Sequence, residues 1–341
     1  MRQKIIHSLL SIVLVLLLAL GLILASGAEP ILAFRYFMYG IFGSLNGFVE
    51  ILVQATPYIF LGLGVSTAFR SGFFNIGGEG QFYMGALSAA MITILVPIAP
   101  VARIILAIVV AFVSGGVWAF IPAYLKNKMG ISETVNTIMF NYIAIMLLGI
   151  AVRGVLQDPG DYLPQSAKID VTLPLLLPPT RLHLGFILAF IAAGLMWFLI
   201  IRTTLGYELK VCGRNPRSAF CLGVPVGRTQ LIAAALSGGL AGVAGVCELI
   251  GVQHRLVENL SGGKGYNAIL IALLASNHPV GVVVVSLCFA AMQVGANTMQ
   301  RQMGIPSSIV SILTGFIVLL ILCKDFWKIH LEHKREKGVR N

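Results

Sequence analysis

The sequence predicts an all-α protein that crosses a membrane about ten times. Hydrophobic residues make up 57% of the 341 residues and charged residues only 11%, whereas soluble domains carry roughly 25% charged residues. Apolar runs of about 20 residues, the length of a helix that crosses the bilayer core, recur along the whole chain. The short alternating segments typical of a membrane β-barrel are absent from the sequence.

The ten predicted spans cover, in chain order, residues 5–26, 49–69, 80–97, 101–125, 133–156, 184–201, 229–251, 263–276, 279–299 and 306–324. The first follows the basic start MRQK, a pattern shared with cleavable signal peptides. Because its apolar run is longer than a usual signal core and further spans follow, we expect it to be retained as a helix. The apolar segment 32–46 is left outside the membrane, on its surface or as a helix cap.

The distribution of basic residues predicts that both termini face the cytoplasm. In that orientation about two thirds of the 24 Lys and Arg residues lie on the cytoplasmic side, in line with the positive-inside rule. The same rule accounts for the net charge of +11, so no nucleic-acid partner is expected. Loop 203–228 is then cytoplasmic. Loop 157–183 is the longest external loop, and its five prolines argue against a continuous helix.

Two segments of the chain resemble each other. NIGGEGQFYMGALSAA, residues 75–90, and NLSGGKGYNAILIALLA, residues 259–275, share an asparagine, a GG-x-G motif and a following apolar helix. The spans that precede the two motifs run in opposite directions, so the copies would form an inverted repeat. Transporters often use this construction, with the solute path between the repeats. Chance is the alternative, because 37 glycines make such motifs frequent.

Polar residues near these motifs are candidates for a solute path. Glu79 in the first copy matches Lys264 in the second, and ionisable residues at membrane depth tend to be paired or to line water. The alternative places both charges at the membrane surface, where they merely end helices. Thr137 and Asn141 share a helical face that we expect to point inward, either as contacts between helices or as path residues. Tyr266 is a candidate for stacking on a base, with simple packing as the alternative.

The complete set of predicted path or gate residues is Asn75, Glu79, Gln81, Thr137, Asn141, Tyr266, Asn267, Gln293 and Asn297. Their amides and hydroxyls suit a neutral polar solute better than an ion. The five cysteines and six histidines show no metal-ligand spacing, and the sequence has no GxxxxGK[ST] phosphate-binding loop. We therefore expect no enzyme activity, no cofactor, no metal and no ATP hydrolysis in this chain itself.

The polar segment between Arg202 and Arg228 carries the most specific motif of the chain, G-x-E-x4-G-R-N-P-x2-A-x3-G. Pro216 fits the first turn of a short helix, and Asn215 fits the N-cap of that helix. A short helix here would form a rigid knob for a cytoplasmic partner. The motif residues, together with Arg217, are Gly206, Glu208, Gly213, Arg214, Asn215, Pro216, Ala219 and Gly223.

This loop resembles the coupling loop of ABC importer permeases, in the family that serves branched-chain amino acids, ribose-type sugars and nucleosides. Segments 72–81, 130–144, 163–167 and 262–281 resemble the nucleoside branch of that family in the same order, so the resemblance covers nearly the whole chain after the first helix. The chain is most similar to the larger of the two permeases of a bacterial nucleoside importer. Arg214 departs from the acidic residue or glycine found in many relatives.

The resemblance implies a single permease domain, 1–341, with ten helices folded like the permease of the vitamin B12 importer, in which spans 2–5 and 7–10 are inverted halves. It implies alternating access driven by a separate cytoplasmic ABC ATPase that binds ATP and Mg. It also implies a second homologous permease and a lipid-anchored binding protein outside a bacterial plasma membrane. The near alternative is import of ribose or another sugar by the same machinery. An ion-coupled secondary transporter is the more remote alternative, because the predicted spans contain few charges.

Overall fold

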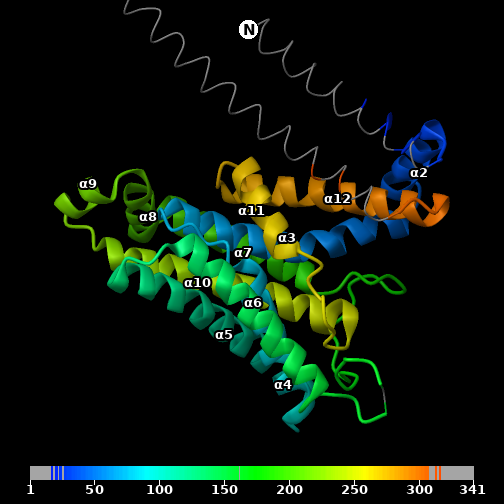
Figure 1. The fold of residues 1–341 in the computed structure, drawn as a ribbon, viewed down its shortest axis with the longest axis horizontal. Helices are drawn as coiled ribbons and strands as arrows, with labels where there is room; N and C mark the ends of the chain where they lie inside the picture. The colour runs from blue at the N-terminus through cyan, green and yellow to red at the C-terminus, as the bar shows by residue number, and fades with distance from the viewer. Residues whose placement is uncertain are drawn as a thin grey trace, which may run out of the picture. The chain divides into compact units, whose positions relative to one another are not determined.

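The computed structural model describes residues 17, 20–21, 23–24, 27–160, 162–306, 312 and 315, and regular secondary structure in these ranges is entirely helical (Figure 1). Three isolated β-bridges, at Gln157–Ser166, Gln165–Val257 and Leu175–His183, accompany the helices. The helices are α2 Pro30–Phe42, α3 Leu45–Arg70, α4 Gly78–Leu95, α5 Pro100–Met129, α6 Glu133–Arg153, α7 Gly185–Arg202, α8 Thr204–Arg214, α9 Pro216–Cys221, α10 Val226–Glu248, the π-helix η1 Leu249–Gln253, α11 Lys264–Leu274 and α12 Pro279–Met303.

Eight of the ten predicted spans coincide with helices, namely α3 to α7, α10 with η1, α11 and α12. The first predicted span lies mostly, and the last almost wholly, outside the described residues. Within the described ranges, six helices are long and apolar enough to cross a membrane: α3, α5, α6, α7, α10 with η1, and α12. The helix at the predicted span 263–276 is only 11 residues long, about half the length that crosses a bilayer core. The segment left outside the membrane, 32–46, largely forms α2.

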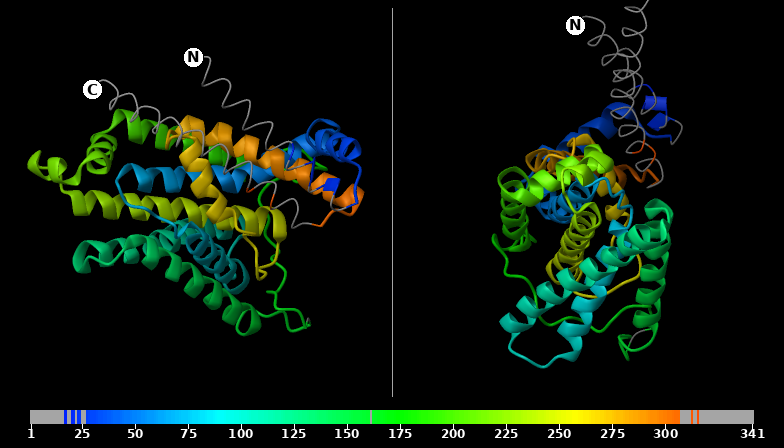
Figure 2. Two further views of the ribbon diagram at one scale, coloured as in Figure 1. Left: turned by 45° about the horizontal axis from the view of Figure 1, so that its top comes forward. Right: turned by 90° about the vertical axis from the view of Figure 1, so that its left-hand side faces the viewer.

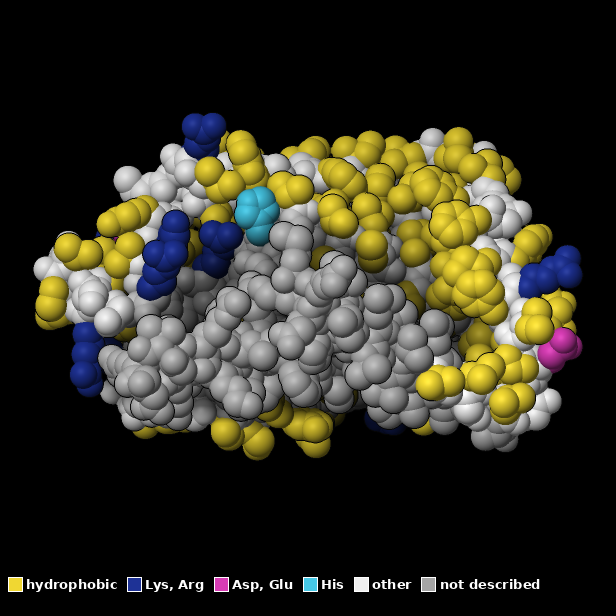
Figure 3. Space-filling view, turned by 90° about the horizontal axis from the view of Figure 1, so that it is seen from above, with side chains coloured by type: hydrophobic (Ala, Val, Ile, Leu, Met, Phe, Trp, Pro, Cys, Tyr) yellow, Lys and Arg dark blue, Asp and Glu magenta, His cyan; other side chains and the backbone are white. Residues whose placement is uncertain are grey.

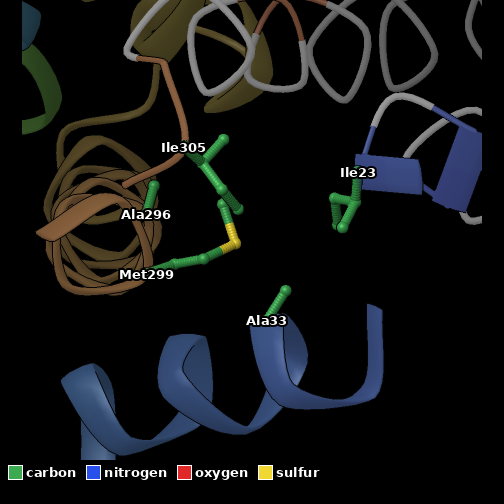
Figure 4. Close-up of a cluster of buried hydrophobic side chains, with 5 residues drawn as sticks. All are labelled: Ile23, Ala33, Ala296, Met299 and Ile305. Atoms are coloured by element: carbon green, nitrogen blue, oxygen red, sulfur yellow. The ribbon is translucent and has the colours of Figure 1, made fainter. Parts of the chain in front are cut away.

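The chain divides into two compact units, residues 1–51 with 290–341, and residues 52–289. In the first unit, small residues bring α2 against the end of α12, because a Cβ on Gly40 would overlap Thr298. A cluster of buried apolar side chains completes this contact, and in Figure 4 the Met299 side chain points toward Ile305. The cluster consists of Ile23, Ala33, Ala296, Met299 and Ile305.

The second unit is built around α4, α5 and α10, which pack against one another (Figures 1 and 2). Glycines let these helices touch backbone to backbone. A Cβ on Gly242 of α10 would overlap the carbonyl oxygen of Ala111 on α5, and a Cβ on Gly85 of α4 would overlap the backbone of Gly242. A Cβ on Gly115 would overlap the carbonyl oxygen of Gly238 in the same way. Inside a bilayer no hydrophobic driving force holds helices together, so close van der Waals packing of this kind stabilises their contacts.

The two ends of the second unit carry different segments. At one end lie α8 and α9, beside the C-terminal end of α3, since Gly213 packs against Arg70. At the same end the start of α10 contacts the end of α5, where Asn127 donates to the carbonyl of Gly227 at 3.0 Å. Figure 3 shows a face on which hydrophobic side chains cover much of the described surface, and most Lys and Arg in view lie toward this end. At the other end segment 157–183 contacts the start of α5 through Arg103 and Asp170. The loops predicted to share a side of the membrane therefore lie together.

The glycine contact predicts a steric penalty at Gly242. Gly242→Ala should lower the free energy of unfolding by about 1–3 kcal/mol, because the added methyl pushes α5 and α10 apart. Gly194→Ala on α7 is the matched control, since a Cβ there meets no atom within 4 Å. The midpoints of thermal unfolding of the two variants in detergent measure the difference. Equal midpoints would contradict the close packing of α5 and α10.

Candidate functional site

The two glycine motifs recognised in the sequence meet in the structure. The first copy leads into α4 at Gly78 and the second into α11 at Lys264. A Cβ on Gly265 would overlap the backbone nitrogen and Cα of Glu79, so the first turns of the two helices touch. We call this contact the repeat junction. Glycine is required there because no larger residue permits two backbones to approach so closely.

The Glu79 carboxylate joins the two helices at the junction. Its side chain is buried, with only 3% of the residue exposed. One oxygen, Oε2, accepts hydrogen bonds from Ser261 Oγ at 2.9 Å and from the backbone nitrogen of Gly265 at 2.8 Å. Gly265 is in the first turn of α11, whose N–H groups have no partner within the helix and attract negative charge. Glu79 of one copy therefore caps the helix of the other copy.

Lys264, which matches Glu79 in the sequence, has a partner of its own. Its ammonium lies 3.3 Å from the Glu248 carboxylate at the end of α10, and their side chains are only 13% and 4% exposed. The junction thus contains two buried carboxylates and one ammonium. Buried charges require such pairing or hydrogen bonding to offset the loss of water.

A network of buried amides surrounds the start of α4. Asn75 Nδ2 donates to Gln81 Oε1 at 3.0 Å and to Ser237 Oγ at 2.9 Å. Asn75 Oδ1 accepts from Gln81 Nε2 and from the backbone nitrogen of Gly77, both at 2.9 Å. Two of the predicted residues, Asn75 and Gln81, therefore bond to each other and hold the glycine turn in shape.

Thr137 and Asn141 of α6 are fully buried, as their shared helical face predicts. Asn141 Oδ1 accepts from the backbone nitrogen of Gly80 at 2.8 Å, so it caps the first turn of α4. Its Nδ2 group lies 3.4 Å from the hydroxyl of Tyr266 on α11. Thr137 Oγ1 accepts from the backbone nitrogen of Ile76 at 3.3 Å.

The other predicted path residues lie on α11 and α12. Asn267 of α11 is 3.5 Å from the Tyr58 hydroxyl on α3. Gln293 and Asn297 of α12 lie 3.5 Å apart and belong to the first unit. The sequence predicted no role for Ser261, Ser237 or Glu248. A signal existed for Glu248, because it interrupts the apolar run of α10.

The predicted cap of the short helix α9 is confirmed. Asn215 Oδ1 accepts from the backbone nitrogens of Arg217 and Ser218 at 3.1 and 3.2 Å, and Pro216 occupies the first helical position. The knob formed by α8 and α9 exposes Phe220 and Leu222, at 75% and 66%. Exposed basic residues flank them, namely Lys210, Arg214 and Arg217.

The base of the knob is fixed to the helices of the second unit. Glu208 accepts a hydrogen bond from Thr229 of α10 at 3.1 Å. Ala219 packs in a buried cluster with Cys212 and Val224. Among the motif glycines, Gly206 packs against the carbonyl of Ile200, while Gly213 packs against that of Arg70 and Gly223 adopts a positive φ of 79°. The motif therefore builds a rigid helix pair that contacts both α3 and α10.

Segment 157–183 is also held in place, at the opposite end of the second unit. It runs beside the chain after α10, with backbone hydrogen bonds from Ser166 to Leu256 and from Ile169 to His254, both at 2.9 Å. The pair Arg255–Asp158, at 2.8 Å, adds a charged contact. Its described residues, 157–160 and 162–183, form turns, bends and isolated bridges but no helix, as its prolines predict.

His183, at the end of this segment, packs against η1. It is buried, with 1% exposed, and its Nδ1 accepts from the backbone nitrogen of Gly185 at 3.2 Å. A Cβ on Gly251 would overlap the imidazole ring. Burial, with His254 nearby, lowers the pKa of His183 from 6.5 to about 4. Burial, with the positive charges of Lys168 and Arg181, also lowers the pKa of His254.

Comparison with known proteins identifies the family. Residues 47–322 match the family described as the branched-chain amino acid transport system permease component. The chain belongs to this permease family. The family predicted from the coupling-loop motif is therefore confirmed, and the protein is a transporter permease. No solved structure matches the chain.

The permease resembles curated relatives over nearly its whole length. It is 34% identical to the guanosine ABC transporter permease NupP of Bacillus subtilis, over 99% of this chain and 100% of the relative. It is 31% identical to the glucose ABC transporter permease TsgB13 of Haloferax volcanii, over 90% and 84%. It is 30% identical to the nucleoside ABC transporter permease NupB of Lactococcus lactis, over 94% and 92%. Bacillus subtilis and Lactococcus lactis each have a second, more distant relative. These are the guanosine permease NupQ of Bacillus subtilis, 25% identical to this chain, and the nucleoside permease NupC of Lactococcus lactis, 24% identical.

The buried His183 predicts an acid-sensitive loop in the permease. Its pKa is lowered in the folded state, so the unfolded chain binds more protons between pH 6.5 and about 4, and stability falls as the pH drops through that window. His183→Asn keeps an acceptor for Gly185 but does not titrate. The free energy of unfolding of this variant should decrease less between pH 6.5 and 4 than that of the wild type, by up to about 1.4 kcal/mol per pH unit. Parallel curves for the two proteins would contradict the prediction.

Proposed function

We propose that this permease is one of two transmembrane subunits of an ATP-driven importer for nucleosides. The observation that carries the substrate class is the full-length similarity to a guanosine permease. The buried amides and hydroxyls around the repeat junction support a neutral polar solute. A sugar is the second candidate, because the glucose permease of Haloferax volcanii is only slightly more distant.

The paired relatives support a heteromeric transmembrane part. Bacillus subtilis and Lactococcus lactis each have two permeases similar to this chain. The sequence identity is higher to NupP than to NupQ, and higher to NupB than to NupC. We infer that this chain corresponds to NupP and NupB in its importer and binds a second homologous permease. A cytoplasmic ATPase that binds ATP and Mg, and a lipid-anchored binding protein outside the cell, complete the proposed importer. The proposed location is a bacterial plasma membrane.

In the proposed topology the whole chain is one permease domain with ten spans. Spans 2–5 and 7–10 form inverted halves, as in the vitamin B12 importer, and the touching starts of α4 and α11 support this arrangement. Both termini and loop 203–228 face the cytoplasm, while loop 157–183 faces the binding protein. The solute path passes the junction, where Asn75, Gln81 and Asn141 shape the glycine turn of α4.

The knob formed by α8 and α9 is the proposed coupling element. Its exposed Phe220 and Leu222 suit an apolar cleft of the ATPase, and the flanking basic residues suit an acidic rim. Movement of the knob would reach α10 through Glu208–Thr229 and α3 through Gly213. ATP-driven closure of the motor then moves the two halves between outward-open and inward-open states. Such a cycle requires that partners bind these two states with different free energies.

The substrate class is tested by uptake of labelled guanosine, uridine and ribose in cells with and without the gene, at equal growth. Loss of guanosine or uridine uptake in the deletion strain, with unchanged ribose uptake, is the expected result. Restoration by a plasmid copy controls for effects on neighbouring genes. Loss of ribose uptake alone would assign the importer to sugars and keep the transport mechanism.

The coupling role predicts a loss of transport without a loss of membrane insertion. Replacing Asn215, Pro216 and Arg217 together by alanine removes the cap and first turn of α9, so uptake should fall to background and the ATPase should no longer co-purify. Alanines at Lys128 and Met129, exposed at the end of α5, provide the control pair and should retain uptake. Normal uptake by the triple variant would rule out coupling through α9.

A further inference from the structure

Glu79 makes a contact that differs from the other caps at the repeat junction. The first turn of α4 is capped by Asn141 of α6, which belongs to the same sequence half. The first turn of α11 is capped by Glu79, which belongs to the other half. Movement of α11 away from α4 therefore leaves the cap of α4 intact but stretches the cap of α11.

The two hydrogen bonds to the Glu79 carboxylate are expected to form and break together. Two donors, Ser261 Oγ and the nitrogen of Gly265, converge on one carboxylate oxygen. Ser261 Oγ in turn accepts from the backbone nitrogen of Lys264 at 3.0 Å, so the serine is fixed to the same helix start. A buried carboxylate that loses these two donors loses much of the compensation for its removal from water.

The packing leaves little room for an intermediate arrangement. The backbone of Gly265 lies directly against that of Glu79, and the neighbouring Lys264 forms an ion pair with Glu248 of α10. A small shift of α11 would therefore separate both donors from the carboxylate together. Such bistable contacts convert small displacements into discrete states.

We propose that Glu79 is a positioning residue that ties the two repeats together in one transport state and releases Ser261 and Gly265 in the other. The tie stabilises the state in which α11 is capped and makes the halves switch as units. This role rests on the proposed function, because a tie of this kind matters only if the repeats move during transport.

Hydrogen exchange tests the tie directly, because the N–H of Gly265 is one of its donors. The experiment compares two samples of the complete importer in lipid nanodiscs. One has no nucleotide, and the other has ATP bound to an ATPase variant that does not hydrolyse it. Mass spectrometry follows a peptide that covers residues 259–270. In the wild type this peptide should be protected in one nucleotide state and exchange at least about tenfold faster in the other.

Three variants separate the tie from general damage. Glu79→Gln should speed exchange of the peptide about tenfold in the protected state and lower uptake, because the neutral amide is the weaker acceptor. Ser261→Ala, which keeps the carboxylate but removes one donor, should act in the same direction with a smaller effect. Glu133→Gln makes the same chemical change at a partly buried carboxylate paired with Lys126, and should change neither quantity.

Wild-type exchange and uptake in an assembled Glu79→Gln importer would overturn the proposal. Equal protection of the peptide in both nucleotide states of the wild type would also overturn it. If Glu79→Gln fails to assemble, Ser261→Ala decides the question by the same two measurements. Absence of ATP-dependent solute uptake by the wild-type importer would instead refute the proposed function.

Discussion

The first turns of α4 and α11 present backbone N–H groups inside the protein, and the need to satisfy these donors constrains the structure around them. In each case the partner comes from a distant part of the chain. Asn141 reaches the nitrogen of Gly80 across 61 positions, and Glu79 reaches that of Gly265 across 186. A buried N–H group without a partner costs free energy comparable to a lost hydrogen bond. The positions of α6 and α11 relative to α4 are therefore set by polar contacts as much as by apolar packing.

The glycine-lined faces of α4, α5 and α10 make these contacts available. Because Gly85, Gly115 and Gly242 bring the three helices to backbone contact, the start of α4 lies deep in the second unit rather than at its surface. Burial of Ser237 on α10 beside Asn75 follows from the same close approach. A bundle with larger residues at these positions would hold its helices further apart and leave the amide network without partners.

The sequence predicted the local features of this protein well. Hydropathy located α3 to α7, and α10 to α12, because a helix in a membrane protein needs a continuous apolar run. The cap at Asn215 and the turn at Pro216 were predictable because cap and helix are neighbours in sequence. The repeat motifs matched Glu79 with Lys264 in the sequence, and the structure brings the starts of the two following helices into contact.

Long-range partners were not predictable in the same way. Lys264 occupies the position in the second repeat that Glu79 occupies in the first, but it forms its ion pair with Glu248. This pairing depends on where α10 lies in the fold, which no local sequence pattern encodes. The π-helix at Leu249–Gln253 was missed because the apolar sequence there fits an α-helix equally well. Its fit against His183 depends on Gly251, whose contact lies 68 positions away in the chain.

The exposed apolar tip of α9 has a consequence for the amount of protein in the cell. Phe220 and Leu222 lie open to solvent in the single chain, and contact with water makes such side chains unfavourable. Any protein that covers them stabilises the folded permease by mass action, in proportion to its own concentration and affinity. Permease that outnumbers the proposed ATPase would remain the less stable population and the first to be degraded. The ratio of the subunits would then adjust itself through folding stability, without a dedicated regulator.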